Sequence, residues 1–438
     1  MRVAVATLGC KVNQYDTATI ETRLRSEGCT IVAFEPGADV YVVNSCTVTD
    51  RADAESRQLA RRARRFNPAA RVIMTGCFAQ VNPTGAAIPE VDHVVGLNRL
   101  PDVLRAVRGE MAAAGQRVAA DDLRTARQVN TIGADTFTGQ TRAFLKIQEG
   151  CDLFCTFCIV PFSRGRSRSV PPRQVLEQLQ NLAQRGFQEV VLTGVHLGGY
   201  GTDLDPPVDL CDLLEMIVEQ PPLPRLRLSS IDPPEVTPRL LDLLLKSEAL
   251  CPHLHIPVQA GADDVLRRMR RKYDTQLLRD LGVEIRSRLP EAAIGTDVIA
   301  GFPGETVAQF EESVALLEAL PLTYFHVFPY SRRSGTTAAK LPDHVPPATI
   351  KRRAHRLRKL GERKRADFAR GFVGRTLPVL VEHAPAGDGH GRWLTGYSRN
   401  YQRVEFVGAE VLANQEVLVR VTHAAGSRLV GEIVRSDG

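Results

Sequence analysis

Directly after a strand pattern at Ala143–Gln148, the chain reads Cys151-Asp152-Leu153-Phe154-Cys155-Thr156-Phe157-Cys158. Three thiolates this close in sequence can bind one metal centre from a single loop. They are one short of the four ligands that a closed structural zinc site or iron–sulfur cluster takes. An iron–sulfur cluster held by three thiolates leaves one iron open for a cofactor or substrate. A zinc site with a distant fourth ligand is the alternative that the spacing leaves open.

The segment around this run alternates strand and helix patterns as far as about residue 330. Six such units in an uninterrupted row predict a partial or complete parallel (β/α) barrel rather than an open sheet. Barrel enzymes carry their chemistry at the carboxyl ends of the strands, and the cysteine run follows such an end. The predicted strands are Ala143–Gln148, Glu189–Thr193, Arg225–Ser229, His253–Pro257, Ala293–Ile299 and Tyr324–Pro329.

A second set of cysteines is dispersed through the first part of the chain. Cys10, Cys46 and Cys77 each follow a predicted strand of an N-terminal α/β domain with a parallel sheet. The carboxyl ends of parallel strands meet at one edge, so three distant thiols can converge there. Cysteine is often simply buried in a core, but the equivalent placement of all three favours metal ligands. Their strands are predicted at Arg2–Leu8, Val40–Asn44 and Val72–Thr75.

The last fifth of the chain, from Pro347 onward, differs in its sequence pattern. A very basic helix is predicted at Pro347–Arg370, followed by short strand-like runs that predict a small antiparallel β-barrel. Lysine and arginine neutralise phosphates, and Trp393, Tyr397 and Tyr401 could stack on unpaired bases. A solvated helix face is the alternative interpretation. The expected domains are residues 1–117, 137–367 and 370–438, with a linker between the first two.

Composition narrows the class of protein. The chain has 438 residues, 43% of them hydrophobic and 24% charged, which is typical of a globular protein of several domains. No apolar run approaches the roughly 20 residues that cross a bilayer, and the N-terminus is not a secretion signal. We therefore expect a cytoplasmic protein whose nine cysteines are not disulfides. Cys29, Cys211 and Cys251 have no partners at useful spacing and are interpreted as packing residues.

Several motifs together resemble one enzyme family. The three-cysteine run after the first barrel strand is similar to the radical S-adenosylmethionine (SAM) superfamily, and the wider set resembles its methylthiotransferases. The C-terminal barrel resembles the RNA-binding TRAM module of these enzymes. The matching segments are Thr7–Asp16, Asn44–Thr49, Gly76–Gln80, Gly150–Arg166, His253–Gly261 and Gly301–Thr306.

The branch within this family follows from fewer residues. Lys11-Val12-Asn13 after Cys10 and the run Thr156–Phe162 look most like the enzymes that act on N6-threonylcarbamoyladenosine in tRNA. Isopentenyladenosine enzymes usually show a Gln-Met-Asn-like segment at that place, and the enzymes that modify a ribosomal protein show Pro-Lys-Asn. Those two substrates are the alternatives within the family.

The resemblance implies cofactors and a mechanism. Cys151, Cys155 and Cys158 would hold a [4Fe–4S] cluster that reduces SAM and yields a 5′-deoxyadenosyl radical, which abstracts hydrogen from C2 of the modified adenine beside the anticodon. A second [4Fe–4S] cluster would provide the inserted sulfur, and a second SAM the methyl group. Its implied ligands are Cys10, Cys46 and Cys77. No acid–base residue is expected, and the electron would come from a donor such as flavodoxin or ferredoxin.

Contacts to SAM are expected at the other barrel strand ends. The common Gly-Gly-Glu form of the segment that binds the methionine amine is absent, and Thr193-Gly194 stands in its place. His253 and His255 are interpreted as core imidazoles, and His196 is undecided. For each candidate a structural role is the alternative. The candidates are Thr193, Gly194, Ser230, Gln259, Asp297 and Gly301.

A hypothesis from another class is a zinc-dependent RNA-binding protein without catalysis, which would use Cys151–Cys158 structurally. A bare RNA binder has no need of six βα units, so the barrel pattern favours the enzyme.

Overall fold

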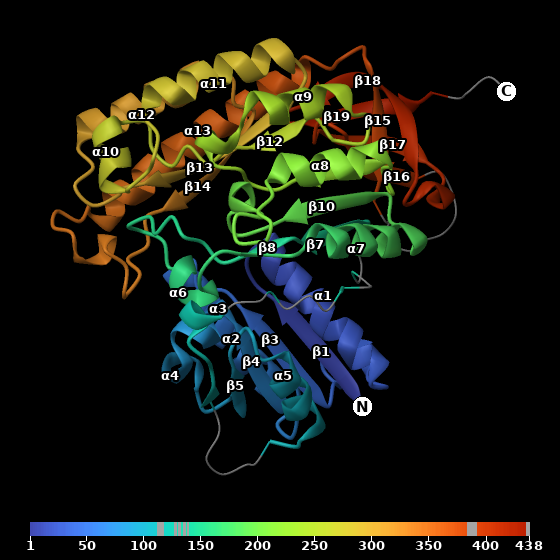
Figure 1. The fold of residues 1–438 in the computed structure, drawn as a ribbon, viewed down its shortest axis with the longest axis vertical. Coiled ribbons are helices and arrows are strands. Elements are labelled where there is room, and N and C mark those ends of the chain that lie inside the picture. Colours follow the sequence, from blue (N-terminus) through green and yellow to red (C-terminus); the bar gives the residue numbers. More distant parts are fainter. Residues whose placement is uncertain are drawn as a thin grey trace.

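Three sheets of different construction follow one another along the chain in the computed structural model (Figure 1). It describes residues 1–111, 118–126, 129, 133–134, 137, 140–382 and 392–434. The expected first domain boundary, residue 117, and much of the expected linker lie outside this part. No helix within it is long and apolar enough to span a membrane.

The N-terminal sheet is parallel throughout, as predicted, in the order β2-β1-β3-β4-β5-β6. Its central strand β3 is buried along its whole length because helices cover both faces. Helices α1 (Lys11–Ser26) and α5 (Leu100–Arg108) pack on one face and α2 (Asp50–Phe66) on the other. The strands are β1 (Arg2–Thr7), β2 (Thr30–Val32), β3 (Val40–Ser45), β4 (Arg71–Gly76), β5 (His93–Val95) and β6 (Val118–Ala119).

The central sheet is a partial parallel barrel. Strand pairings give the orders β7-β10-β11 and β12-β13-β14, and isolated bridges such as Ser230 to His255 join the two halves. Within the described residues no pairing joins β14 back to β7, so the barrel has an open side. All six predicted strands are present: β7 (Arg142–Lys146), β10 (Glu189–Thr193), β11 (Arg225–Leu228), β12 (His253–His255), β13 (Ala293–Ala300) and β14 (Tyr324–Pro329).

Helices cover the outside of this barrel, whereas its open side meets the first domain. Helix α1 packs against β7, and the N-terminal domain lies below the barrel in Figure 1. The covering helices are α7 (Pro172–Gln184), α8 (Leu210–Glu219), α9 (Pro238–Lys246), α10 (Asp263–Arg268), α11 (Thr275–Arg288) and α12 (Val307–Ala319).

The basic helix α13 (Pro347–Arg370) packs on β14 and leads into a closed five-stranded barrel, β15-β16-β17-β19-β18. Four of its pairings are antiparallel, as predicted, whereas β17 and β19 run parallel. Strand β19 was not expected from the sequence. The strands are β15 (Thr376–Val381), β16 (Arg392–Ser398), β17 (Arg403–Gly408), β18 (Glu416–Ala425) and β19 (Arg428–Ile433).

A turn of this small barrel docks on the first residues of the barrel strands. The buried Arg227 bonds Glu189 and donates to the carbonyl of Arg399 at 2.8 Å. Tyr401 lies against the Arg227 guanidinium, 5.0 Å from the ring centroid, and against the His253 ring at 4.9 Å. Tyr397 stacks on Tyr401. These two tyrosines are half-buried and their rings pack against side chains of the protein, whereas Trp393 is 65% exposed.

Candidate active site

The first cysteine trio, Cys151, Cys155 and Cys158, lies in a tight loop after β8 (Gln148–Glu149). The loop begins at Gly150, whose φ of +75° suits glycine and where a Cβ atom would lie 1.9 Å from the Arg166 carbonyl. The Cys151 amide donates to the Gly165 carbonyl at 3.1 Å. All three thiols are half-buried and free. The structure thus holds the loop in a form that presents three sulfurs together.

An arginine accompanies this trio. Arg271 donates to Cys155 Sγ at 3.1 Å and forms an ion pair with Asp232 at 2.6 Å. Burial raises the pKa of Cys151 and of Cys158 to about 12, so the free thiols are neutral at pH 7. A bound metal centre would supply the positive charge that converts them to thiolates. No pattern in the sequence pointed to Arg271, because it is 116 residues from Cys155.

The second trio occupies one edge of the N-terminal sheet. Cys10 precedes α1, Cys46 follows β3, and Cys77 begins α3 (Cys77–Val81) directly after β4. A Cβ atom at Gly9 would lie 2.8 Å from Cys46 Sγ, and Cys77 Sγ lies 3.7 Å from Asn13 Oδ1. The structure therefore brings together the three strand ends, as the sequence predicted.

The surroundings of the second trio are buried and positive. Burial raises the pKa of Cys46, and it raises that of Cys77 to about 12, while the Arg164 guanidinium opposes both shifts. Asn13 ties the site to the sheet by donating to the carbonyls of Leu8 at 2.7 Å and Ser45 at 3.0 Å. Cys46 and Cys77 thus resemble Cys151 and Cys158, because burial raises the pKa of their thiols, whereas Cys10 is exposed.

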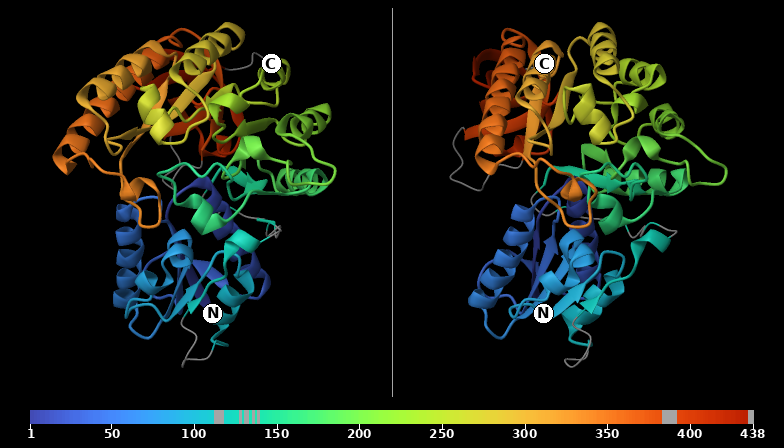
Figure 2. Two further views of the ribbon diagram at one scale, coloured as in Figure 1. Left: turned by 60° about the vertical axis from the view of Figure 1, so that its left-hand side comes forward. Right: turned by 90° about the vertical axis from the view of Figure 1, so that its left-hand side faces the viewer.

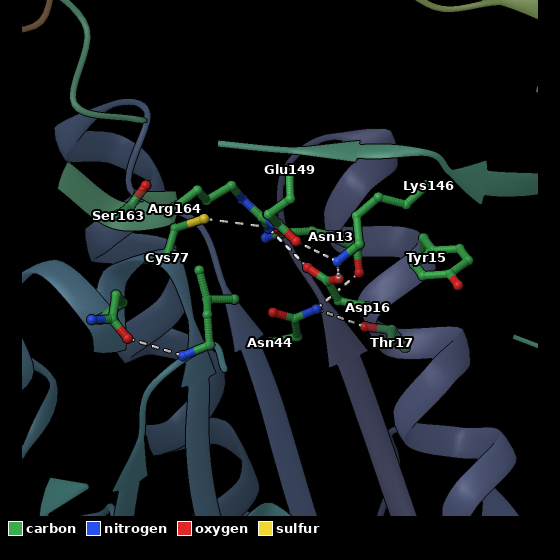
Figure 3. Close-up of polar contacts among 12 residues, drawn as sticks. Asn13, Tyr15, Asp16, Thr17, Asn44, Cys77, Lys146, Glu149, Ser163 and Arg164 are labelled. Atoms are coloured by element: carbon green, nitrogen blue, oxygen red, sulfur yellow. Dashed lines mark hydrogen bonds and ion pairs between the residues drawn. The ribbon is translucent and has the colours of Figure 1, made fainter. Parts of the chain in front are cut away.

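Arg164 belongs to a buried ion network between the first domain and the barrel (Figure 3). It pairs with Asp16 of α1 at 2.8 Å and with Glu149 of β8. Lys146 of β7 pairs with the same two carboxylates, at 2.7 Å and 2.5 Å. Two cations thus share two anions, and the network connects α1 to the cysteine loop of the barrel. No spacing pattern in the sequence indicated it.

A second link lies on the other side of the interface. Arg333, in the loop after β14, donates to Thr47 Oγ1 at 2.7 Å and pairs with Asp53 at 2.6 Å and with Asp50. This loop reaches down to the N-terminal domain (Figure 2). Because Thr47 follows Cys46 directly, the bond from Arg333 also fixes the backbone beside Cys46.

A cavity of about 180 Å³ lies between the segment that follows Cys46 and the loop that carries Cys151, Cys155 and Cys158. Val48 and Thr49 contribute from the first domain, Phe157 and Cys158 from the cysteine run, and β13 and β14 from the barrel. The remaining lining residues are Ile159, Val160, Gln259, Asp297, Ile299, Phe328, Pro329, Tyr330 and Ser331. Of the six cysteines only Cys158 lines this cavity, and the first domain borders it through Val48 and Thr49, which closely follow Cys46 in the chain.

The expected SAM contacts divide into two groups. Gln259 and Asp297 line the cavity. The other four do not: Thr193 is buried at the end of β10, Gly194 lies against the Gln148 side chain, Ser230 is bridged to β12, and the Gly301 amide donates to Glu305 at 2.9 Å.

The histidines of the barrel are bonded to neighbours. His253 bonds the Tyr324 hydroxyl at 2.8 Å, and His255 bonds Asp297 at 2.8 Å. His196 pairs with Glu235 and lines a second cavity of about 370 Å³ beside Cys155. The positive charge of Lys11 also faces this interior. As expected for packing residues, Cys211 and Cys251 are buried and Cys29 packs against the N-terminal core.

Comparison with known proteins gives the class first. A model of the radical SAM superfamily matches residues 145–317, and a model described as uncharacterized protein family UPF0004 matches residues 2–96. Among solved structures, the radical SAM methyltransferase TsrM from Kitasatospora setae superposes with a TM-score of 0.56 at 17% identity, over 77% of this chain and 76% of that one. The architecture is thus that of a radical SAM protein.

Curated relatives narrow the class to a family. The threonylcarbamoyladenosine tRNA methylthiotransferase MtaB of Bacillus subtilis is 39% identical over 99% of this chain and 96% of its own length. The enzyme of the same name from Aquifex aeolicus is 39% identical over 87% and 93%. A tRNA-2-methylthio-N6-dimethylallyladenosine synthase of Clostridium botulinum is 31% identical over 98% and 96%. The chain belongs to the radical SAM methylthiotransferases, in the MtaB branch.

The two trios predict two independent metal centres. Anaerobically purified protein should contain about eight irons, as two four-iron clusters require. Alanine at Cys151, Cys155 and Cys158 should leave about four, and so should alanine at Cys10, Cys46 and Cys77. The matched control, alanine at the packing residues Cys29 and Cys211, should keep eight. Zinc in place of iron, or an unchanged count in either triple variant, would contradict the assignment.

Proposed function

We propose that this protein adds a methylthio group to C2 of N6-threonylcarbamoyladenosine beside the anticodon of tRNA. The observation that carries the proposal is the cavity lined by Cys158 of the first trio and by Val48 and Thr49, which follow Cys46 of the second, because a substrate base bound there would lie close to both cysteine sites. The relatives of the same branch are named for this nucleoside. The corresponding dimethylallyladenosine and ribosomal-protein activities are the less favoured candidates.

The residues present fit two [4Fe–4S] clusters. Each trio offers three free thiols to one centre, and each has a guanidinium, Arg271 or Arg164, that balances the negative charge of thiolates. Three ligands leave one iron of each cluster open. When bound, the clusters and SAM supply the electron, the radical chemistry at C2 and the inserted sulfur.

The chain's own residues would bind and orient the reactants. Gln259 and Asp297 present an amide and a carboxylate to the cavity, groups suited to the polar parts of SAM. Phe157 gives the same cavity an apolar face on which an adenine ring can lie. An aromatic C–H carries no acidic proton, so the proposal needs no general base. The ion network and Arg333 connect the first domain to the barrel segment.

RNA would bind on α13 and the small barrel, which we propose corresponds to a TRAM-like module. Lys351, Arg358 and Lys359 are exposed on α13 and have no acidic partner among the described residues. Trp393 adds an exposed ring for stacking on a base. We propose a cytoplasmic location and a small redox protein, such as flavodoxin or ferredoxin, as electron donor.

Nucleoside analysis tests the proposed function directly. A strain lacking its own enzyme, complemented with this gene, should regain 2-methylthio-N6-threonylcarbamoyladenosine in digested tRNA, detected by mass spectrometry. The Cys151→Ala variant should not restore it, because the first cluster would lose a ligand. Recovery of the methylthiolated dimethylallyl nucleoside alone, or of neither, would refute the proposal.

The RNA surface makes a separate prediction. Alanine at Lys351, Arg358 and Lys359 should weaken tRNA binding, because these side chains would no longer neutralise phosphates. The slope of log affinity against log salt should fall by about 0.7 to 0.9 for each phosphate left without its cation. Filter binding at several salt concentrations measures this slope.

The matched control replaces three arginines of the same helix that already pair with acids, Arg356, Arg363 and Arg370. Their charge is largely neutralised, so the effect should be smaller. Equal slopes for the wild type and the variant with alanine at Lys351, Arg358 and Lys359 would show that the exposed side of α13 faces only solvent and does not bind RNA.

A further inference from the structure

Lys11 lies beside the second cysteine trio, where its side chain could contact a bound substrate. It is the first residue of α1 and follows Cys10 of the second trio. Helix α1 packs on β7 at the open side of the barrel, and the Lys11 side chain is half-buried. The charged groups that face it belong to the barrel and to the docked turn: Tyr401, Arg227, Arg142 and Asp297. Its side chain thus lies beside the second trio and within electrostatic reach of these barrel groups.

This ammonium has no partner, unlike the cations around it. Arg142 lies 3.5 Å from Glu382 and stacks on Tyr397, and Arg227 is bonded to Glu189. Lys11 forms no hydrogen bond or ion pair with any residue in the part of the chain that the structure describes. Asp297, the acid that faces it, is already bonded to His255 at 2.8 Å and to His326 at 3.2 Å.

The electrostatics of the interior agree with an unfilled anion position. Burial alone would raise the pKa of Tyr401, but the charges of Arg142, Lys11 and Arg227 outweigh burial and lower it. A half-buried cation without a partner is costly, and an anion brought by a ligand removes that cost. Asp297, which lies within electrostatic reach of Lys11, forms part of the wall of the cavity that Cys158 lines.

The two nucleosides named for the relatives differ in charge at N6. A threonylcarbamoyl group ends in a carboxylate, whereas a dimethylallyl group is a hydrocarbon. We propose that Lys11 binds the carboxylate of the N6 substituent and thereby selects threonylcarbamoyladenosine. This inference rests on the proposed function and names its specificity-determining residue.

The test uses anticodon stem-loop RNAs and the reconstituted, full-length protein. The stem-loops carry threonylcarbamoyladenosine, its neutral methyl ester, or dimethylallyladenosine, and fluorescence anisotropy gives the affinities without SAM. The wild type should bind the acid about tenfold or more tighter than the ester, as a charge-assisted hydrogen bond implies.

The variants are Lys11→Met, Lys11→Arg and the control Lys246→Met, at an exposed lysine ending α9. Lys11→Met should bind acid and ester equally, at the affinity the wild type has for the ester. Lys11→Arg should retain most of the preference, and Lys246→Met all of it. Iron content equal to the wild type confirms that each variant is folded.

A second carboxylate, the methionine part of SAM, shares this chemistry, so equilibrium dialysis with SAM alone forms the other arm. Lys11→Met should bind SAM as the wild type does. Loss of SAM binding with retained preference for the acid would assign Lys11 to SAM and overturn the inference. So would a wild type that binds ester and acid equally, a result that needs no variant.

Methylthiolation of the acid stem-loop separates this inference from the proposed function. If the wild type modifies that stem-loop but Lys11→Met keeps full preference for the acid, the inference fails and the proposed function stands. If the wild type does not modify it at all, the proposed function fails as well.

Discussion

Two cations and two carboxylates buried between the first domain and the barrel hold the molecule in its working arrangement. Asp16 of α1 receives Lys146 and Arg164 from the barrel segment, and Glu149 receives the same pair; the four side chains are 3% to 16% exposed. Burying such charges is expensive, and removing one partner typically costs about 3–5 kcal/mol because the others lose their compensation. The network therefore ties α1 to the segment that carries the cysteine loop, and loss of any one of its members should be costly.

Much of the site then follows from the first two turns of α1. Cys10 precedes the helix, Lys11 lies within electrostatic reach of the barrel groups, Asn13 bonds the sheet edge and Asp16 enters the network. Because one rigid element carries all four, the metal site, the substrate position and the domain contact are held in fixed relation. The Cys151 amide also bonds the residue after Arg164, so the same network steadies the first trio.

The sequence predicted those parts of the site that depend on local spacing. The cysteine run and the three strand-end cysteines were found because a short loop gathers ligands and parallel strands end at one edge. The sequence did not indicate three contacts: Arg271 with Cys155, Arg333 with Asp53, and Arg164 with Asp16. In each pair the two residues are more than a hundred positions apart, and no sequence pattern encodes such a pair. The packing of Tyr401 against His253 was not foreseen, because an aromatic residue in a turn looks exposed until the surface on which it docks is known. Strand β19 escaped notice for a similar reason, since its pairing is decided by closure of the barrel.

The central claim is that the two cysteine trios hold two metal centres on either side of the cavity that Cys158 lines from the barrel and that Val48 and Thr49 line from the first domain. Diffraction at the iron absorption edge, from crystals grown without oxygen, tests it most directly. The account predicts two iron peaks, one at Cys10, Cys46 and Cys77 and one at Cys151, Cys155 and Cys158, on opposite sides of that cavity. A single peak, a zinc signal at either trio, or a second peak turned away from the cavity would contradict it.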